Sequence, residues 1–217
     1  DKGRARGLAL KCGVPVLPGT DAATSIEEAR AFLQSMGSHG AIMIKAIAGG
    51  GGRGMRPVLS LPELESAFER CRSEAMQAFG NGDVYVEKLF PRARHIEVQV
   101  IGDGSGDVTH LWERECSLQR NRQKLVEIAP APGLSTAVRE RMIEAALRMA
   151  RDVKLRSLAT FEFLVEQKAK DHAEFAFIEA NPRLQVEHTV TEEVTGIDLV
   201  RAQLDIAGGR TLEELGL

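Results

Sequence analysis

A run of four glycines follows an apolar stretch in the segment AIMIKAIAGGGGRGM, residues 41–55. An ordered glycine costs roughly 0.5–1 kcal/mol relative to alanine, so a run is retained where the backbone needs positive φ or where a ligand approaches it closely. Phosphate is the usual ligand of that kind, because backbone N–H groups bind its oxygens. The run therefore indicates either a glycine-rich hairpin that closes over phosphates or a flexible surface hairpin.

The residues around the glycines favour the phosphate-binding hairpin. No Lys-Ser or Lys-Thr pair follows the last glycine, as a Walker A loop requires, and the next segment, MRPVLS, has a strand pattern where a dinucleotide-binding fingerprint needs a helix. Lys45 lies on the strand before the glycines and Arg53 lies among them. Two cations beside a flexible backbone suit an anion, provided that residues elsewhere complete the site.

The composition is that of an ordinary globular protein. The 217 residues are 43% hydrophobic and 27% charged, and the formal net charge is −3, so no nucleic-acid or membrane partner is expected. The cationic run RECSLQRNRQK has no interleaved aromatic residues, which argues against RNA contact. No membrane-length apolar stretch or signal peptide is visible, and three scattered cysteines favour a reducing compartment. We expect the cytoplasm, or the mitochondrial matrix in a eukaryote.

The first part of the chain has the pattern of a small α/β lobe over residues 17–90, after a helical lead-in over residues 1–16. Ser25 with Glu28, and Ser60 with Glu63, are expected to form capping boxes that begin two helices. The second helix has one apolar face, formed by Leu64, Phe68, Cys71 and Ala75. Three short strands, AIMIKAI, MRPVLS and VYVEKLF, complete the lobe.

The second part, residues 91–217, has the pattern of a larger antiparallel sheet. A hairpin over residues 94–115, a helix over about residues 135–153 and two strands, TFEFLVE and EFAFIEAN, predict a sheet with helices on one side. The fold class is therefore α+β. The chain begins in a helical pattern and ends just after a Thr-x-x-Glu helix start, so we expect it to be a piece of a longer protein.

The last two strands carry candidate metal ligands. Residues two apart on a strand share a face, so Glu179 and Asn181 project together. If Glu162 lies opposite Glu179, this face also presents Leu164, Phe175 and Phe177, although the seven-residue loop leaves the register open. Carboxylate and amide oxygens suit magnesium held jointly with substrate phosphates. The alternative is that the glutamates solvate an exposed sheet face; a dense polar cluster follows at once, which favours a site: Arg183, Gln185, Glu187 and His188.

Several segments, in order and spacing, resemble the ATP-grasp core of biotin carboxylase. They are GGGGRGM after a strand lysine, VYVEKLF, RHIEVQV, ERECSLQRNRQKLVEIAPAPGLS, TFEFL, FIEANPRLQVEHTVTEEVTGIDLV and AQLDIAGG. The resemblance runs nearly end to end. Related ATP-grasp enzymes such as carbamoyl-phosphate synthetase share the glycine loop and the metal carboxylates but not the string EANPRLQVEHTVTE. The resemblance implies an ATP-grasp fold with a small lid lobe, a larger antiparallel-sheet lobe and the nucleotide between them.

The resemblance also implies an ATP-dependent C–N ligase. Bicarbonate attacks the γ-phosphate to give carboxyphosphate, which carboxylates biotin on a carrier protein. The implied cofactors are ATP and magnesium or manganese, and the implied partners are a biotin carboxyl carrier domain, a carboxyltransferase component and further copies in a homo-oligomer. The family has an N-terminal Rossmann-like domain and a C-terminal domain that are absent here, so the chain alone is expected to fold without carboxylating biotin.

The resemblance assigns roles to individual residues. The nucleotide phosphates are held by Lys2 and Lys45 and by the amides of Gly51 and Gly52; the adenine strand and the rest of the nucleotide site are Glu87, Lys88, Leu89, Phe90, His95 and Gln119. The metal ligands are Glu162, Glu179 and Asn181. Arg122 stands where many relatives carry histidine, which leaves its contact with ribose or phosphate in doubt.

The bicarbonate residues implied by the resemblance follow the metal ligands in sequence. Arg183 grips the anion in a bidentate manner and later steadies the biotin enolate, and Glu187 takes the bicarbonate proton. The segment Gln185–Val186 adds backbone contacts, and Lys124 is a further lysine on the bicarbonate side.

Two other functions remain open at the level of sequence. A carbamoyl-phosphate-synthetase-like ligase would share ATP and bicarbonate but would use ammonia. A noncatalytic nucleotide-binding or assembly module would keep the glycine loop but would not need Glu187. The acid that is finally carboxylated is not encoded here, because a separate carboxyltransferase selects it.

Overall fold

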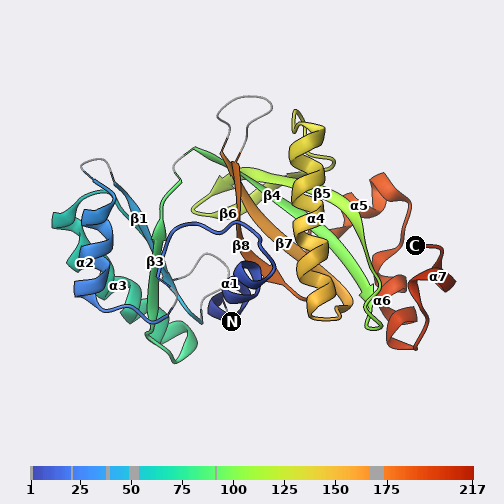
Figure 1. The fold of residues 1–217 in the computed structure, drawn as a ribbon, viewed down its shortest axis with the longest axis horizontal. Coiled ribbons are helices and arrows are strands. Elements are labelled where there is room, and N and C mark those ends of the chain that lie inside the picture. Colours follow the sequence, from blue (N-terminus) through green and yellow to red (C-terminus); the bar gives the residue numbers. More distant parts are fainter. Residues whose placement is uncertain (1, 21, 38–39, 49–53, 91, 167–173) are drawn as a thin grey trace. The chain divides into compact units, whose positions relative to one another are not determined.

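The computed structural model describes residues 2–20, 22–37, 40–48, 54–90, 92–166 and 174–217 (Figure 1). It forms two compact units, each of which is described by itself. Unit 1 comprises Asp1–Gly7, Leu17–Pro91 and Asn121–Gln123, and unit 2 comprises Leu8–Val16, Arg92–Arg120 and Lys124–Leu217. Gly51, Gly52 and Arg53, which the sequence assigns to phosphate binding, lie outside the described residues.

Unit 1 is a three-stranded antiparallel sheet packed against two helices. The strand order is β2 (Met55–Val58), β1 (Ile42–Ala46), β3 (Val84–Lys88), and the helices are α2 (Ile26–Ser35) and α3 (Leu61–Phe79). The predicted apolar face of α3 is confirmed, and it packs with strand residues in one core: Ala29, Leu33, Ile42, Ile44, Val58, Leu64, Phe68, Cys71, Val84 and Val86. Helix α1 (Lys2–Lys11) contributes residues to both units.

Only one of the two predicted capping boxes in this unit forms. At α2 the Ser25 hydroxyl accepts from the Glu28 amide, and the Glu28 carboxylate accepts from the Ser25 amide at 2.8 Å. At α3 the Ser60 side chain makes no capping hydrogen bond, so that prediction is wrong. The Glu63 carboxylate accepts from the Leu59 amide instead, and the reciprocal pair cannot close.

Unit 2 is a five-stranded antiparallel sheet in the order β6 (Gln123–Ile128), β5 (Val108–Arg120), β4 (Ala93–Asp103), β7 (Arg156–Glu166), β8 (Glu174–Asn181). Its helices are α4 (Thr136–Asp152), α5 (His188–Thr195), α6 (Leu199–Ala207) and α7 (Leu212–Leu215). The predicted helix start at Thr211 forms a complete capping box with Glu214. None of the described helices has the length and apolar character to cross a membrane.

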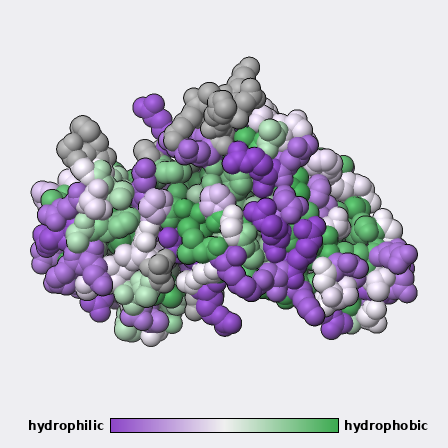
Figure 2. All heavy atoms as spheres, viewed as in Figure 1, coloured by the Kyte–Doolittle hydropathy of each residue, from purple (hydrophilic) through white to green (hydrophobic). Residues whose placement is uncertain are grey.

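Helices cover both faces of this sheet, so the prediction of helices on one side is wrong. Arg141 of α4 lies over the Phe175 ring, and Phe175 packs edge-on against Phe163. The opposite face buries a separate cluster of strand and helix residues: Ile101, Leu111, Leu158, Leu199, Ala202, Ile206 and Leu212. The outer side of α4 is a hydrophilic band in Figure 2, formed by Glu140, Glu144, Arg148 and Arg151.

Two β-bulges change which side chains share a face. Glu162 pairs with Glu179, as the metal hypothesis requires, but the next pair is Phe163 with Phe177, so Ile178 is an extra residue on β8. Phe175 and Phe177 therefore lie on the α4 face, and the prediction that they share a face with Glu162 is wrong. A second bulge, at Trp112 (φ 65°), lies between the pairs Val98–Glu113 and Val100–His110. A bulge re-aims the side chains that follow it.

Candidate functional site

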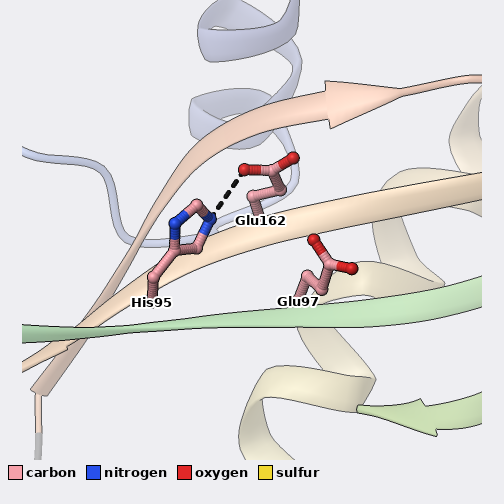
Figure 3. A group of neighbouring side chains, drawn as sticks. All are labelled: His95, Glu97 and Glu162. Atoms are coloured by element: carbon pink, nitrogen blue, oxygen red, sulfur yellow. Dashed lines mark hydrogen bonds and ion pairs between the residues drawn. The ribbon is translucent and has the colours of Figure 1, made fainter. Parts of the chain in front are cut away.

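The sheet face of unit 2 opposite α4 carries a dense group of ionisable side chains; we call it the site face. His95 and Glu97 lie two apart on β4, and Glu162 is the partner of Glu97 on β7. Figure 3 shows the imidazole of His95 directed at the Glu162 carboxylate, with Glu97 beside them. One ligand atom from each of these three residues lies within 4.8 Å of the others. Such a group is costly to bury unless cations neutralise it.

Lys124 supplies one of those cations. Its Nζ donates to Glu97 Oε2 and, at 2.6 Å, to Glu187 Oε1, and it lies 3.7 Å from Glu162 Oε1. Burial disfavours the charged ammonium, but the nearby carboxylates of Glu162 and Glu97 outweigh burial and raise the pKa of Lys124 above its usual value. Lys124 is therefore a firmly charged lysine surrounded by three carboxylates.

Glu187 is the N-cap residue of α5 and faces Lys124. Burial acts to raise the pKa of this carboxyl, but the hydrogen bond from Lys124 and the backbone lower it below its usual value of 4.5. While paired with Lys124, Glu187 is thus a weak base. An anion that drew Lys124 away would increase its basicity, because the ion pair that lowers its pKa would be lost.

The hydrogen bonds around His95 define one tautomer. Gln119 Nε2 lies 2.8 Å from His95 Nδ1 and also donates to the Cys116 carbonyl at 2.7 Å. An amide nitrogen can only donate, so Nδ1 is the acceptor and Nε2 carries the proton. Nε2 then donates to Glu162 Oε2 at 2.7 Å. The two residues assigned to the nucleotide site are therefore linked to the first assigned metal ligand.

Asn181 and Glu162 meet directly. Asn181 Nδ2 donates to Glu162 Oε1 at 2.7 Å, which leaves the amide oxygen of Asn181 unused by this bond. Glu179 lies opposite Glu162 in the sheet register. The structure thus gathers the three residues assigned to the metal on adjacent positions of β7 and β8.

A buried ion pair that the sequence reasoning missed lies beside this group. Arg114 of β5 pairs with Glu97, and the two side chains have no exposed surface. Arg114 Nε donates to Glu97 Oε1 at 2.6 Å. The signal in the sequence was a lone glutamate in the apolar strand RHIEVQV, two residues after His95 and facing an arginine across a hairpin.

Glu127 of β6 accepts a hydrogen bond from the buried thiol of Cys116. Its Oε1 atom is buried and has no hydrogen-bond partner among the described residues. Burial is the main cause that raises the pKa of Glu127 to about 7; the Cys116 bond and Lys124 act against it, and Glu97 and Glu187 act with it. Glu127 is therefore partly protonated at neutral pH.

This raised pKa predicts how Glu127 affects stability. The folded protein binds the Glu127 proton more tightly than the unfolded chain, whose pKa is near 4.5, so stability is lost as pH rises from about 4.5 through 7. Glu127→Gln mimics the neutral acid and should raise the melting temperature at pH 8, by the equivalent of about 1 kcal/mol for this half-buried group. The gain should vanish below the unfolded-state pKa, near pH 4. Thermal unfolding at the two pH values measures it, and an equal effect at both would refute the prediction.

The residues assigned to bicarbonate lie between β8 and α5. Arg183 is exposed, with Nη1 donating to the Leu184 carbonyl at 3.1 Å, and it lines a cavity of about 750 Å³. Gln185 is buried, and its carbonyl accepts from the amide of His188 and lies 2.8 Å from His188 Nδ1. Val186 is 91% exposed. The Gln185 carbonyl is therefore already used, whereas Arg183 is open to solvent.

Unit 1 holds the residues assigned to the nucleotide phosphates and adenine. Lys45 and Glu87 form a buried ion pair across β1 and β3. The amides of Lys88 and Leu89 donate to the carbonyls of Pro18 and Ala41, and the Lys88 ammonium lies 5.5 Å from the centre of the Phe90 ring. Any adenine contact from the backbone of these two residues would therefore use their carbonyls.

The two remaining assigned residues lie at the start of the chain and in a turn. Lys2 begins α1 and is partly buried. Arg122 lies in the two-residue turn between β5 and β6, where Asn121 and Arg122 have φ of 51° and 61°, and its Nη1 donates to the Met55 carbonyl at 2.7 Å. This contact ties the turn to β2 inside unit 1.

Comparison with known proteins identifies the family. The family described as carbamoyl-phosphate synthase L chain, ATP binding domain, matches residues 1–215. The chain belongs to this family. It is 53% identical over 218 aligned residues to a pyruvate carboxylase of Aspergillus terreus, an alignment that covers all of this chain but 18% of that relative. The chain therefore spans under a fifth of the length of this curated relative.

Solved structures of the family have the same fold. The biotin carboxylase–β-γ-ATP complex from Campylobacter jejuni matches 98% of this chain and 46% of its own, with a TM-score of 0.92 and 46% identity. The biotin carboxylase domain dimer of Hydrogenobacter thermophilus 2-oxoglutarate carboxylase, in complex with MgADP, ADP and bicarbonate, matches 98% of this chain and 46% of its own, with a TM-score of 0.91 and 42% identity. The predicted α+β, ATP-grasp fold is confirmed.

Proposed function

We propose that the chain is the ATP-binding core of a biotin carboxylase, which activates bicarbonate as carboxyphosphate and carboxylates carrier-bound biotin. The observation that carries this proposal is the Lys124–Glu187 ion pair, 2.6 Å long, set between Glu97 and Glu162 on the site face. A cation and a carboxylate held together in this way can bind a small oxyanion and accept its proton. The 53% identity to a pyruvate carboxylase supports the assignment.

The site residues divide the work on bicarbonate. Lys124 and Arg183 supply positive charge for the anion, and Arg183 can contact it in a bidentate manner. Because Lys124 lowers the pKa of Glu187, a bound anion that engages Lys124 would leave Glu187 a stronger base at the moment when the proton must move. Binding of the substrate and activation of the base are then coupled through one lysine.

The residues present fit a magnesium or manganese ion that accompanies ATP. Glu162, Glu179 and Asn181 offer the hard oxygen ligands that such ions prefer, and the bulge at Ile178 keeps the two glutamates on one face. When bound, the ion would neutralise phosphate charge during phosphoryl transfer. The C. jejuni structure is a complex with β-γ-ATP and the H. thermophilus structure a complex with MgADP and ADP. For this chain we propose ATP, with Lys45, Glu87–Phe90, His95 and Gln119 as its contacts.

The partners follow from the same proposal. A carboxylated biotin must be carried to an acceptor, so we propose a biotin carboxyl carrier domain and a carboxyltransferase component. Because the H. thermophilus domain is described as a dimer, we propose that this protein also self-associates.

The proposal is tested by ADP release from the full-length protein. Release that requires both bicarbonate and biotin supports it. Release that requires bicarbonate and ammonia, independent of biotin, would instead support a carbamoyl-phosphate-synthetase-like ligase. ATP binding without any turnover would support a noncatalytic nucleotide-binding module.

Glu179→Gln is expected to weaken binding of magnesium-ATP several-fold or more. Loss of a charged ligand typically costs about 1.5–3 kcal/mol, which corresponds to roughly 10–150-fold in affinity. Calorimetry with ATP and magnesium measures the change, and Glu174→Gln, at the other end of β8, is the matched control. Equal affinities of the two variants would remove Glu179 from the metal site.

A further inference from the structure

Both partners of the Lys124–Glu187 ion pair are connected to the same buried arginine, Arg114, each through one other part of the structure. Arg114 donates through Nε to Glu97 Oε1, and Glu97 Oε2 accepts from Lys124. Arg114 also donates through Nη1 to Thr191 Oγ1 at 2.8 Å. Thr191 is buried on α5, the helix whose N-cap residue is Glu187. The Arg114 guanidinium therefore bonds to Glu97, which holds Lys124, and to Thr191, which lies on the helix that begins at Glu187.

The guanidinium is well suited to hold Glu97 and Thr191 at a fixed separation. It is planar and rigid, so its donors point in directions that cannot change independently. Two further bonds orient it, from Nη1 to Gln99 Oε1 at 2.9 Å and from Nη2 to Thr160 Oγ1 at 3.2 Å. Arg114 has no exposed surface, so water does not compete for these bonds.

The bulge at Trp112 explains how Arg114 reaches this position. Leu111 packs in the cluster of the site face with Ile101. In a regular strand a residue three positions later would point to the opposite face. The extra residue restores Arg114 to the site face, where it pairs with Glu97.

We propose that Arg114 is a positioning residue, which sets the separation of Lys124 and Glu187 by holding Glu97 on the sheet and Thr191 on α5. The consequence for catalysis rests on the proposed function, whereas the consequence for geometry does not. Arg114 acts through other side chains and need not touch a substrate. A buried arginine that served stability alone would have the same burial but no specific effect on this ion pair.

Thr191→Val separates these two roles in the full-length protein. Valine keeps the shape of threonine but removes the hydroxyl, and the Arg114–Glu97 bond is left in place. We expect kcat for bicarbonate- and biotin-dependent ADP release to fall roughly 10–100-fold, the usual effect of losing a group that orients a site residue. The KM for ATP should stay within about two-fold of the wild-type value, since the substitution does not change how ATP binds before the reaction. Arg114→Lys, which keeps the charge but loses the planar donors, should resemble Thr191→Val.

Thr195→Val is the matched control, one turn later on α5. Its hydroxyl bonds to the Thr191 carbonyl and the Ile197 amide and does not touch Arg114. We expect wild-type kcat for Thr195→Val and recovery of activity in Thr191→Ser, which restores the hydroxyl. In a Glu187→Gln background, Thr191→Val should lower kcat further by less than about two-fold. A positioning residue acts through the group that it positions, so its loss matters little once that group is gone.

Either of two results would overturn the proposal. One is a kcat for Thr191→Val equal to that of Thr195→Val in an active protein. The other is a crystal structure of Thr191→Val in which Lys124 Nζ and Glu187 Oε1 remain within hydrogen-bond distance, about 3.2 Å. The second result tests the geometry even if the wild-type protein shows no biotin-dependent turnover, an outcome that would contradict the proposed function instead.

Discussion

Glu187→Gln is expected to reduce turnover of the full-length protein roughly 10²–10⁴-fold, the range for loss of a general base. Glutamine keeps the size of the side chain and can still accept a hydrogen bond from Lys124, so the local structure should persist. It cannot take a proton from bicarbonate. ATP affinity should change little, since no hydrogen bond or ion pair joins Glu187 to the described nucleotide residues.

Steady-state ADP release and ATP calorimetry together measure this effect. Glu193→Gln is the matched control, because Glu193 is exposed on the same helix and undergoes the same change of charge. A Glu187→Gln protein that carboxylates biotin at a rate near that of the Glu193→Gln protein would exclude Glu187 as the base. A large loss of ATP affinity would show that it acts on the nucleotide instead.

Much of the fold follows from local signals in the sequence. The predicted capping residues Ser25 and Thr211 each accept the expected amide hydrogen bond, and Ser135, at the predicted start of the helix over about residues 135–153, also accepts one. Alternating apolar residues mark the strands, because a strand that buries one face must alternate. The failed capping box at Ser60 shows the limit of such signals: the same Ser-x-x-Glu spacing is present, but the glutamate finds the preceding amide instead.

The parts that sequence reasoning missed depend on distant contacts. An alternating pattern assumes a regular strand, and the sequence FAFIEAN gives no indication that Ile178 forms a β-bulge. The bulge nevertheless decides that Phe177 faces α4 while Glu179 faces the site. Helices α5 and α6 were likewise unassigned; the contacts of α6 with the sheet, through Leu199, Ala202 and Ile206 in the cluster with Leu158, are between residues far apart in the sequence.

The candidate site was found in part for the same reason. Glu162, Glu179 and Asn181 are close in the hairpin, so strand parity and one assumption about register were enough to group them. Arg114 and Glu97 required the fold, since their bond matters through Thr191, 77 residues away. The resemblance supplied roles for Lys124 and Glu187, and the geometry adds that each restrains the other.

Arg114→Met is expected to cause the largest loss of stability among these variants. Glu97 would stay fully buried with Lys124 as its remaining ion-pair partner, and removal of one member of a buried pair typically costs about 3–5 kcal/mol. For this 217-residue chain by itself, that corresponds to a fall in melting temperature of roughly 6–20 °C. Thermal unfolding followed by circular dichroism measures it.

A control pair isolates the cause. Lys11 and Asp152 are 2.7 Å apart, almost the same distance as Arg114 and Glu97, but the Lys11 side chain is 68% exposed. Lys11→Met should leave the melting temperature nearly unchanged, because an exposed lysine and its partner remain solvated after the pair is broken. Similar losses for Lys11→Met and Arg114→Met would mean that burial is not what makes the second pair important.

The double variant Arg114→Met with Glu97→Gln shows why Arg114→Met loses stability: because the bonds of the guanidinium are lost, or because Glu97 is left as a buried, uncompensated charge. Most of the cost of breaking a buried pair is the partner left uncompensated, so neutralising Glu97 should restore part of the stability lost in Arg114→Met, by about 1 kcal/mol or more. The same variant should not regain turnover, because Lys124 then loses a carboxylate that holds it beside Glu187. Stability and activity would thus separate in one protein. A double variant no more stable than Arg114→Met would show that the four hydrogen bonds of the guanidinium, and not the charge of Glu97, account for the loss.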